Sequence, residues 1–209
     1  MKRSWEGWTP ESVSSLDPAR ANIRSYIERR QLRRVLEQIG SIDPAVEVGA
    51  GYGRMTVVLL EHARTVVAME REWELRDRGI LIVPDAVWRE LPDITKLPAE
   101  DDAFAFAMTF TVLQHVTDEV AELAIAELRR IVWPGGHFLM VEDTNAGRRY
   151  VDPTDASHIS FGRSVAWYEA AAAPARLVSK TPRWVEPGYH QDGRLRKYVG
   201  HYLLFEVPP

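Results

Sequence analysis

Three alternate glycines between an apolar strand and a helix constrain the fold of this chain more than any other feature. Residues 45–48 read as a buried strand and residues 54–62 as a helix, with Gly49, Gly51 and Gly53 between them. Glycines at such a junction let the backbone turn tightly and bring a ligand against the main chain at the N-terminus of the helix. In a parallel sheet, ligands bind at this end of the first strand, where the topology switches direction. The glycine loop (Gly49 to Gly53) therefore predicts a parallel sheet with a ligand site at its edge.

Strand-like and helix-like segments alternate after the glycine loop. The segment 80–83 competes with 86–91 for the third strand, and two later segments flank a Gly-, Pro- and Asp-rich connection at 186–195 that is typical of a hairpin. This order predicts an α/β fold: a doubly wound, mostly parallel seven-stranded sheet with a C-terminal antiparallel hairpin and helices on both faces. The expected strands are 45–48, 65–69, 86–91, 103–110, 137–142, 176–185 and 196–207.

Helical periodicity is clearest in two segments. The first runs from 18 to 39, with Asp17 as its cap, and the second runs from Asp118 to about Val132, with Thr117 as its cap. The sequence Pro134-Gly135-Gly136 is expected to end the second helix, a shorter helix is expected at 164–172, and the polar segment 145–161 reads as a loop. The apolar faces are expected to comprise Ala19, Ile23, Tyr26, Ile27, Val35, Leu36 and Ile39 in the first helix and Val120, Leu123, Ala124, Leu128 and Ile131 in the second.

Composition narrows the class of protein. With 209 residues, 45% of them hydrophobic and 27% charged, the chain has the size and make-up of one globular domain. No apolar stretch approaches the roughly 18 to 20 residues that a membrane helix needs, and the N-terminus lacks the apolar region of a secretory signal. Because cysteine is absent, disulfides and thiolate chemistry are excluded. We therefore expect a cytoplasmic protein that does not bind membranes.

The charge of the chain bears on its partners. The net charge is −4, whereas a protein that follows a nucleic-acid backbone usually carries a positive excess. The basic cluster of Arg29, Arg30, Arg33 and Arg34 is interpreted as a solvated helix face, so nucleic acid is disfavoured as a partner. This face and the two C-terminal strands could serve self-association into a homodimer. The six histidines show no metal-binding spacing, and without cysteine we expect no essential metal.

The spacing of the glycines distinguishes two classes of cofactor. Dinucleotide-binding folds carry G-x-G-x-x-G, whereas this loop reads G-x-G-x-G and follows the acidic Glu47. The segment resembles the first motif of the class I methyltransferases that use S-adenosylmethionine. The likeness covers about residues 45–143: VVAME ends in Glu70, PDITKLP contains Asp93, and DDAFA, VLQH and LRRIVWPGGHFLMVED follow in the family's order. Ala105 departs from the family, which usually has an acidic residue there.

The resemblance implies one Rossmann-like domain over 1–209 that binds S-adenosylmethionine. It divides the chain into an N-terminal helical lid (1–40), a cofactor-binding core (45–143) and a substrate-side part (144–209). Glu47 is expected to anchor the cofactor's charged groups, Glu70 its ribose and Asp93 its adenine, although each carboxylate could instead be a loop cap, a surface charge or the start of a turn. The expected cofactor-binding residues are Glu47, Gly49, Ala50, Gly51, Gly53, Glu70, Asp93, Ile94 and Phe110.

Methyl transfer from a sulfonium needs the acceptor atom held in line with the methyl group, and a hydroxyl acceptor also needs a base. His115, just after the fourth strand, is the first candidate base, and an orienting or capping histidine is the alternative. Candidate substrate-binding residues are Asp143 and His158, after the fifth strand, and Tyr26, which with Trp5 and Trp8 could close over the site.

The acceptor predicted from the sequence is a small molecule methylated on oxygen or nitrogen. Carbon methylation through a cysteine adduct is excluded, and residues 109–112 (TFTV) replace the [DN]-P-P-[YF] motif of enzymes that methylate base or amide nitrogens. Two other hypotheses stay open at this point. One is an NAD-dependent oxidoreductase, which shares the fold, and the other is a catalytically degenerate methyltransferase fold that serves as a binding protein.

Overall fold

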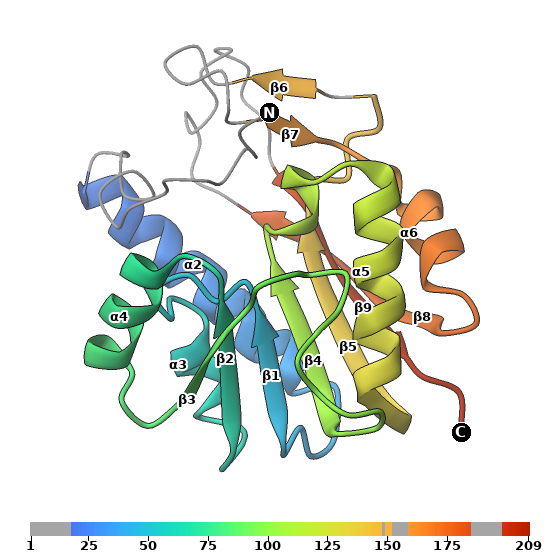
Figure 1. The fold of residues 1–209 in the computed structure, drawn as a ribbon. Helices are drawn as coiled ribbons and strands as arrows, with labels where there is room; N and C mark the ends of the chain where they lie inside the picture. Colours follow the sequence, from blue (N-terminus) through green and yellow to red (C-terminus); the bar gives the residue numbers. More distant parts are fainter. Residues whose placement is uncertain (1–17, 148, 152–158, 185–197) are drawn as a thin grey trace.

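The computed structural model of the chain describes residues 18–147, 149–151, 159–184 and 198–209 (Figure 1). Of the residues singled out above, Trp5, Trp8, Asp17 and His158 lie outside these ranges. Within them, no helix combines the length and the apolar character needed to cross a membrane.

Seven strands form one sheet in the order β3-β2-β1-β4-β5-β9-β8. The five strands β1 to β5 pair in parallel, and β9 pairs antiparallel with both β5 and β8. The predicted doubly wound sheet with its C-terminal antiparallel pair is thus confirmed, and its switch point lies between β1 and β4. The strands are β1 (Ala45–Val48), β2 (Val66–Glu70), β3 (Val87–Glu90), β4 (Phe104–Phe110), β5 (Val132–Glu142), β8 (Arg176–Trp184) and β9 (Tyr198–Glu206).

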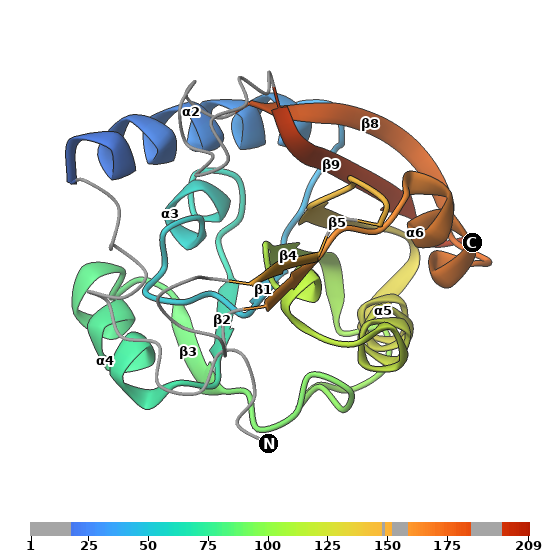
Figure 2. The ribbon, with the colours of Figure 1, turned by 90° about the horizontal axis from the view of Figure 1, so that it is seen from above.

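Helices cover both faces of the sheet, as predicted. Seen from above, α2 and α3 lie on one side of the central strands and α5 lies on the other, beside α6 (Figure 2). The contacts agree: α2 packs on β8, β9 and α3, whereas α5 packs on β4, β5 and α6. The helices are α2 (Pro18–Leu36), α3 (Thr56–Leu59), α4 (Trp73–Ile82), α5 (Asp118–Ile131) and α6 (Val165–Ala172), with a 3-10 turn, η1 (Leu113–His115), after β4.

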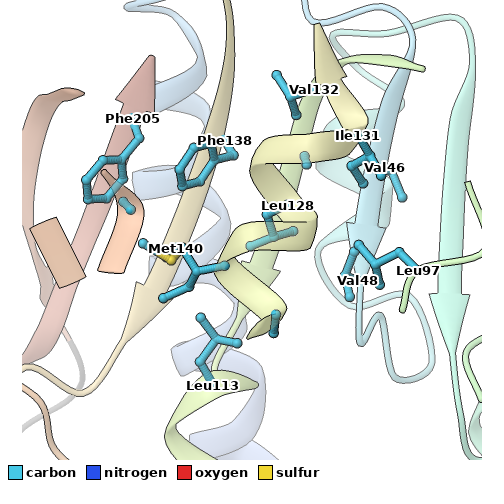
Figure 3. Packing of buried hydrophobic residues seen from close by; sticks show 14 of the residues in the cluster. Val46, Val48, Leu97, Leu113, Leu128, Ile131, Val132, Phe138, Met140 and Phe205 are labelled. Carbon is cyan, nitrogen blue, oxygen red and sulfur yellow. The ribbon is translucent and has the colours of Figure 1, made fainter. Parts of the chain in front are cut away.

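The core has two layers because side chains alternate along each strand. In β1, Val46 and Val48 belong to the layer under α5, and Ala45 belongs to the layer under α2 and α3. All residues of β1, β2 and β4 are buried, which explains why these strands are apolar almost without interruption. Figure 3 shows the first layer, where the rings of Phe138 and Phe205 stack with centroids 5.1 Å apart.

The region between β2 and β3 differs in part from the prediction. The third strand is at Val87–Glu90, as favoured, and the competing segment 80–83 forms the C-terminal end of α4 and the residue after it, a helix that the sequence did not reveal. Helical periodicity is weak there because Ile80 and Leu81 are exposed and Gly79 interrupts the pattern. Gly79 is the point at which α4 packs on Trp88: a Cβ atom at that position would lie 2.1 Å from the indole ring.

Two shorter segments also differ from the prediction. The supposed loop 145–161 contains a small antiparallel pair, β6 (Arg149–Val151) with β7 (Ile159–Phe161), whose three-residue strands are too short to show alternation. β5 begins at Val132, so the Pro-Gly-Gly sequence lies inside the strand rather than before it. The regular part of the predicted helix 54–62 is only α3, with turns on either side.

The predicted helix faces need three corrections. Tyr26 is 65% exposed and Leu123 is 55% exposed, so neither belongs to the buried stripe of its helix. In α5 the buried face is shifted to include Ala121 and Ile125. Thr117 occupies the N-cap position of α5, but its side chain makes no capping hydrogen bond.

Candidate active site

A cavity of about 740 Å³ opens at the carboxyl ends of the parallel strands. Its wall is formed by the glycine loop after β1, the ends of β2 and β4, the segment after β3, η1, the start of α5, and β7. Of the residues predicted to bind the cofactor, the cavity is lined by Glu47, Gly49, Ala50, Gly51, Glu70, Asp93, Ile94 and Phe110. His115, the candidate base, also lines it.

The other predicted residues lie elsewhere. Gly53, Tyr26 and Asp143 do not line the cavity. Gly53 has a left-handed backbone, with φ +86°. A Cβ atom at this position would lie 2.7 Å from the side chain of Val83, so glycine is needed for the loop to pack against the end of α4. Asp143 is buried, and its Oδ1 accepts hydrogen bonds from the backbone and side-chain nitrogens of Asn145.

The first two glycines of the loop have different physical roles. Both have left-handed backbones, with φ +76° at Gly49 and +59° at Gly51. A Cβ atom at Gly49 would lie 2.6 Å from Val112, because the chain leaving β4 crosses directly over the loop. A Cβ atom at Gly51 would meet no atom within 4 Å and would occupy the cavity space that a ligand needs. The loop thus fits a ligand that lies against its main chain at Gly51.

Glu70 ends β2 beside the glycine loop. Its Oε2 accepts a hydrogen bond from the Gly51 N–H at 2.6 Å, and its Oε1 accepts from the N–H groups of Arg71 and Glu72 at 2.8 and 2.9 Å. Burial raises the pKa of Glu70 above its usual value, and these backbone hydrogen bonds oppose the rise. The carboxylate is therefore held beside the glycine loop by three amides, and it lines the cavity.

Glu47 lies inside β1 with its side chain toward α3. Its Oε2 accepts a hydrogen bond from the Thr56 hydroxyl at 2.6 Å, and the side chain is almost fully buried. Burial raises its pKa to about 8, so without a ligand the group is largely protonated at neutral pH. A sulfonium or ammonium group in the cavity would favour the ionised form, so Glu47 fits the positive charges of S-adenosylmethionine.

Asp93 and Ile94 follow β3 at the far end of the cavity. Asp93 Oδ1 accepts hydrogen bonds from the backbone N–H and the hydroxyl of Thr95, at 2.9 and 2.8 Å. Asp93 therefore shapes its own turn, as the alternative reading proposed, and it also lines the cavity.

His115 ends η1 and is oriented by three neighbours. Its Nδ1 lies 3.0 Å from the Ile159 carbonyl and 3.4 Å from the Ser160 hydroxyl, both in β7. A carbonyl can only accept, so the neutral ring carries its proton on Nδ1 and its lone pair on Nε2. The side-chain amide nitrogen of Gln114 donates to His115 Nε2 at 3.3 Å. The amide oxygen of Gln114 accepts a hydrogen bond from the Asp143 backbone N–H at 3.1 Å.

Two buried charged residues that the sequence did not single out hold η1 in place. Glu142, at the end of β5, accepts hydrogen bonds from the N–H groups of Val112, Leu113 and Gln114 and from the Thr109 hydroxyl, at 3.1 to 3.2 Å. Burial raises the pKa of Glu142 to about 7. Its position in the sequence VED, at a strand end, was the only signal for such a role.

Arg163 holds the opposite side of η1. Its guanidinium donates to the carbonyls of Leu113 and Val116, at 2.7 and 2.5 Å, and to the Asp118 carboxylate at 2.7 Å. Only 5% of this residue is exposed, and its guanidinium lies 4.8 Å from the centroid of the Trp167 ring. The sequence gives no signal for this arginine, because its partners are 45 to 50 residues away.

The basic cluster on α2 is less uniform than a solvated face. Arg33 forms a two-point ion pair with Glu61 at 2.6 and 2.7 Å, and Arg29 donates to the Arg54 carbonyl at 2.9 Å. Arg30 and Arg34 are exposed, as expected. The cluster thus helps α2 to contact the segment that follows the glycine loop.

The site residues form a row that follows the sheet order. Asp93 and Ile94 follow β3, Glu70 ends β2, the glycine loop follows β1, and Phe110 ends β4. The family described as a methyltransferase domain matches residues 46–140, which contain this row. The fold and the family match are those of class I, Rossmann-like methyltransferase domains, and S-adenosylmethionine is the expected cofactor.

Particular relatives share parts of the chain. An uncharacterized 37.1 kDa protein in transposon TN4556 of Streptomyces fradiae is 49% identical over an alignment of 148 residues, and the alignment covers 67% of this chain and 41% of that protein. An uncharacterized methyltransferase of Oceanobacillus iheyensis is 27% identical over an alignment of 161 residues, and the alignment covers 71% of each of the two chains. The chain therefore spans less than half the length of the first of these relatives.

A solved structure has the same fold. It is a complex of the Haloferax volcanii Trm112 methyltransferase activator with a methyltransferase, and it matches with a TM-score of 0.70 at 16% identity. The match covers 90% of this chain and 91% of the other.

Proposed function

We propose that this protein transfers the methyl group of S-adenosylmethionine to an oxygen or nitrogen atom of a small molecule bound at the His115 end of the cavity. The observation that carries the proposal is the arrangement of the wall: the cofactor row ends at Phe110, and His115 follows it on η1 with Nε2 as its basic nitrogen. The methyltransferase-domain match over 46–140 supports the reaction class.

A small acceptor is supported by the surroundings of His115. The cavity wall there includes the apolar side chains of Val116, Ile159 and Phe161, and β7 lies directly against the imidazole through the Ile159 carbonyl. Figure 1 shows the β6–β7 pair above the carboxyl edge of the sheet. Apolar walls with a few placed polar groups are typical of small-molecule sites.

The proposed chemistry needs little beyond placement. When bound, S-adenosylmethionine supplies a methyl group that is already activated. Glu70 and the Gly51 main chain hold the nucleoside part, and Glu47 lies where it can stabilise positive charge. For a hydroxyl acceptor, the substrate hydroxyl replaces the Gln114 amide at His115 Nε2, and Nε2 takes the proton while the Nδ1–H stays hydrogen-bonded to the Ile159 carbonyl. For an amine acceptor, the same residues orient the substrate and the base is dispensable.

The test is release of S-adenosylhomocysteine in the presence of small hydroxyl and amine compounds, with ribosomal RNA and unfolded protein as competing acceptors. We expect turnover with a small compound. For a hydroxyl acceptor, His115→Asn should lower kcat/KM by roughly 10²- to 10⁴-fold and leave cofactor binding unchanged.

A matched control is His201→Asn. His201 Nδ1 lies 2.6 Å from the Thr144 hydroxyl and does not line the cavity, so this variant should keep near wild-type turnover. Methylation of RNA or protein, with no turnover of any small compound, would contradict the proposed acceptor class.

A further inference from the structure

The imidazole of His115 is hydrogen-bonded at both of its ring nitrogens. Nδ1 donates to the Ile159 carbonyl at 3.0 Å, and Nε2 accepts from the side-chain amide of Gln114 at 3.3 Å. The lone pair that a base uses therefore faces a donor before any substrate enters. His115 lines the cavity and Gln114 does not, so Gln114 acts on a substrate only through the ring.

The end of β5 fixes the orientation of the Gln114 amide. The amide oxygen accepts from the Asp143 N–H at 3.1 Å, and a main-chain N–H can only donate. The nitrogen of the same amide is therefore the atom that faces the imidazole. The main chain of Gln114 is held as well, because its N–H donates to the Glu142 carboxylate at 3.1 Å. Two successive residues thus decide which end of the amide meets His115.

An amide in this orientation favours one state of Nε2. An unprotonated Nε2 accepts the N–H of the amide, whereas a protonated Nε2 would place two donors opposite each other. The Ile159 carbonyl makes the complementary demand at Nδ1, which must carry a proton to bond to it. Together, Gln114 and Ile159 select the neutral ring of His115 with Nε2 as its basic nitrogen.

The contact between Gln114 and His115 is weak enough to be exchanged for a substrate. Its length of 3.3 Å is at the long end for an N–H donor, so little stability is lost when another donor takes its place. The O–H group of an acceptor is such a donor, and a hydroxyl that donates to Nε2 is placed to give up its proton there. The amide therefore occupies the position of the substrate's donor.

The charged side chains packed around η1 have other partners. Glu142 of β5 accepts from amides of η1, and Arg163 donates to carbonyls of η1 and to Asp118 of α5. The carboxylate of Asp143 accepts hydrogen bonds from the turn that follows it. Gln114, which meets Nε2, is by contrast uncharged, so its effect on the ring comes from the direction of its N–H group.

We propose that Gln114 is a positioning residue that keeps Nε2 of His115 unprotonated and reserves its lone pair for the acceptor hydroxyl. The inference rests on the proposed function, in which His115 is the base. During transfer the hydroxyl proton moves to Nε2 while the oxygen bonds to the methyl carbon and the carbon–sulfur bond breaks. The ring then carries a proton on each nitrogen, and the Gln114 amide returns to Nε2 only after the added proton has left.

The experiment is NMR of protein with isotope-labelled histidine, in which the imidazole nitrogen shifts report the proton on each ring nitrogen. The spectrum of His115→Asn identifies the His115 signals. We expect Nδ1 to be protonated and Nε2 unprotonated in wild type at mildly alkaline pH. Gln114→Glu keeps an acceptor for the Asp143 N–H but replaces the donor by a carboxylate. In that variant Nε2 should take up its proton roughly 1 to 3 pH units higher than in wild type.

Two further variants complete the comparison. Gln114→Met keeps the size of the side chain without either hydrogen bond, so its protonation midpoint should lie between the other two, and it serves if the carboxylate variant folds poorly. Gln38→Glu is the matched control. The Gln38 amide likewise donates to a carbonyl, that of Arg34, and accepts from the Ser179 hydroxyl, at 3.0 and 2.9 Å, and it does not line the cavity. This control should leave the His115 signals unchanged.

Turnover of a hydroxyl compound gives a second readout. In Gln114→Glu the rise of kcat/KM with pH should move to the same higher pH as the protonation of Nε2, because the base must first lose its proton. A merely structural role of Gln114 would instead lower kcat/KM by the same factor at every pH.

The outcomes separate this inference from the proposed function. A protonated Nε2 in wild type at mildly alkaline pH, or one protonation midpoint shared by wild type and both Gln114 variants, would overturn the inference alone, since the NMR signals need no acceptor. Undiminished turnover of hydroxyl compounds by His115→Asn would contradict His115 as the base, and the inference would fall with it.

Discussion

In Glu47 and Glu142, burial destabilises the ionised carboxylate by more than its hydrogen bonds stabilise it. Their pKa values rise to about 8 and about 7, against an ordinary value of 4.5, with burial as the main cause in each. In the folded chain these groups keep their protons to a higher pH than they do in the unfolded chain. The stability that they contribute is therefore complete below pH 4.5 and is lost as the pH rises through the folded values.

The first prediction concerns this pH dependence. Between pH 6.5 and 8 the ligand-free protein should lose about 2 kcal/mol of unfolding free energy through Glu47 alone, since each pH unit inside the window corresponds to about 1.4 kcal/mol. Urea denaturation across this range measures the loss, and Glu47→Gln should flatten the profile. Glu61→Gln is the control, because a hydrogen bond from Arg33 lowers the pKa of Glu61 and keeps it ionised throughout. An unchanged slope in Glu47→Gln would show that Glu47 is ionised in the folded protein.

At the scale of elements, the short turn η1 matters most for the site. It carries His115, and it is fixed by Glu142 from the end of β5 and by Arg163 from the segment before α6. A three-residue 3-10 turn has almost no intrinsic stability, so its orientation comes from these two side chains. The carboxylate satisfies its amide groups and the guanidinium satisfies its carbonyls.

The second prediction is that Arg163→Met loosens η1. The variant leaves the Leu113 and Val116 carbonyls without their donor in a buried place, which should cost roughly 2 to 4 kcal/mol of unfolding free energy. Arg176→Met, which breaks an exposed pair with Glu206, should cost less than about 1 kcal/mol. Denaturation measures both losses, and hydrogen exchange at residues 113–116 locates the first. Equal losses in the two variants would contradict this role of Arg163.

The same elements show what a sequence can and cannot reveal. Strands β1 and β4 were predictable because both faces are buried, so that their residues are apolar in succession. The helix α4 was not, because its exposed apolar residues and Gly79 mask the helical period, and the reason for Gly79 lies on β3. The row of cavity-lining residues from Glu47 to Phe110 could be predicted, because the motifs that carry it lie close together in the chain.

The buried ion pair of Glu28 and Arg183 could not be predicted, because the two residues are distant in the chain. Glu28 and Arg183 are 155 residues apart, and neither has a local motif around it. A charged residue in a helix is usually solvated, so only the folded structure shows that Glu28 is buried.

At the scale of the whole molecule, the cavity couples ligand binding to global stability. The last prediction is that S-adenosylhomocysteine at about 100 times its Kd raises the melting temperature by roughly 5 to 10 °C, since this saturation is worth about 2.7 kcal/mol. NAD and NADH at equal concentration should give no shift. Differential scanning calorimetry measures both, and Gly51→Val, whose side chain would enter the cavity, should abolish the shift. Stabilisation by NAD alone would contradict the cofactor assignment.

The side chain of Glu28 in α2 also links segments that are far apart in the chain, through its ion pairs with Arg54 and Arg183. It joins α2, the segment after the glycine loop, and β8, and Gln31 of α2 exchanges two hydrogen bonds with the backbone of Trp184 in β8 (Figure 2). A chain emerging from the ribosome presents the glycine loop long before β8 exists. Arg54 can pair with Glu28 by then, but Arg183 cannot yet secure α2 against the sheet. The contacts that secure α2 against β8 therefore form only in the late stages of synthesis, and a nascent chain that ends before β8 has the glycine loop without them.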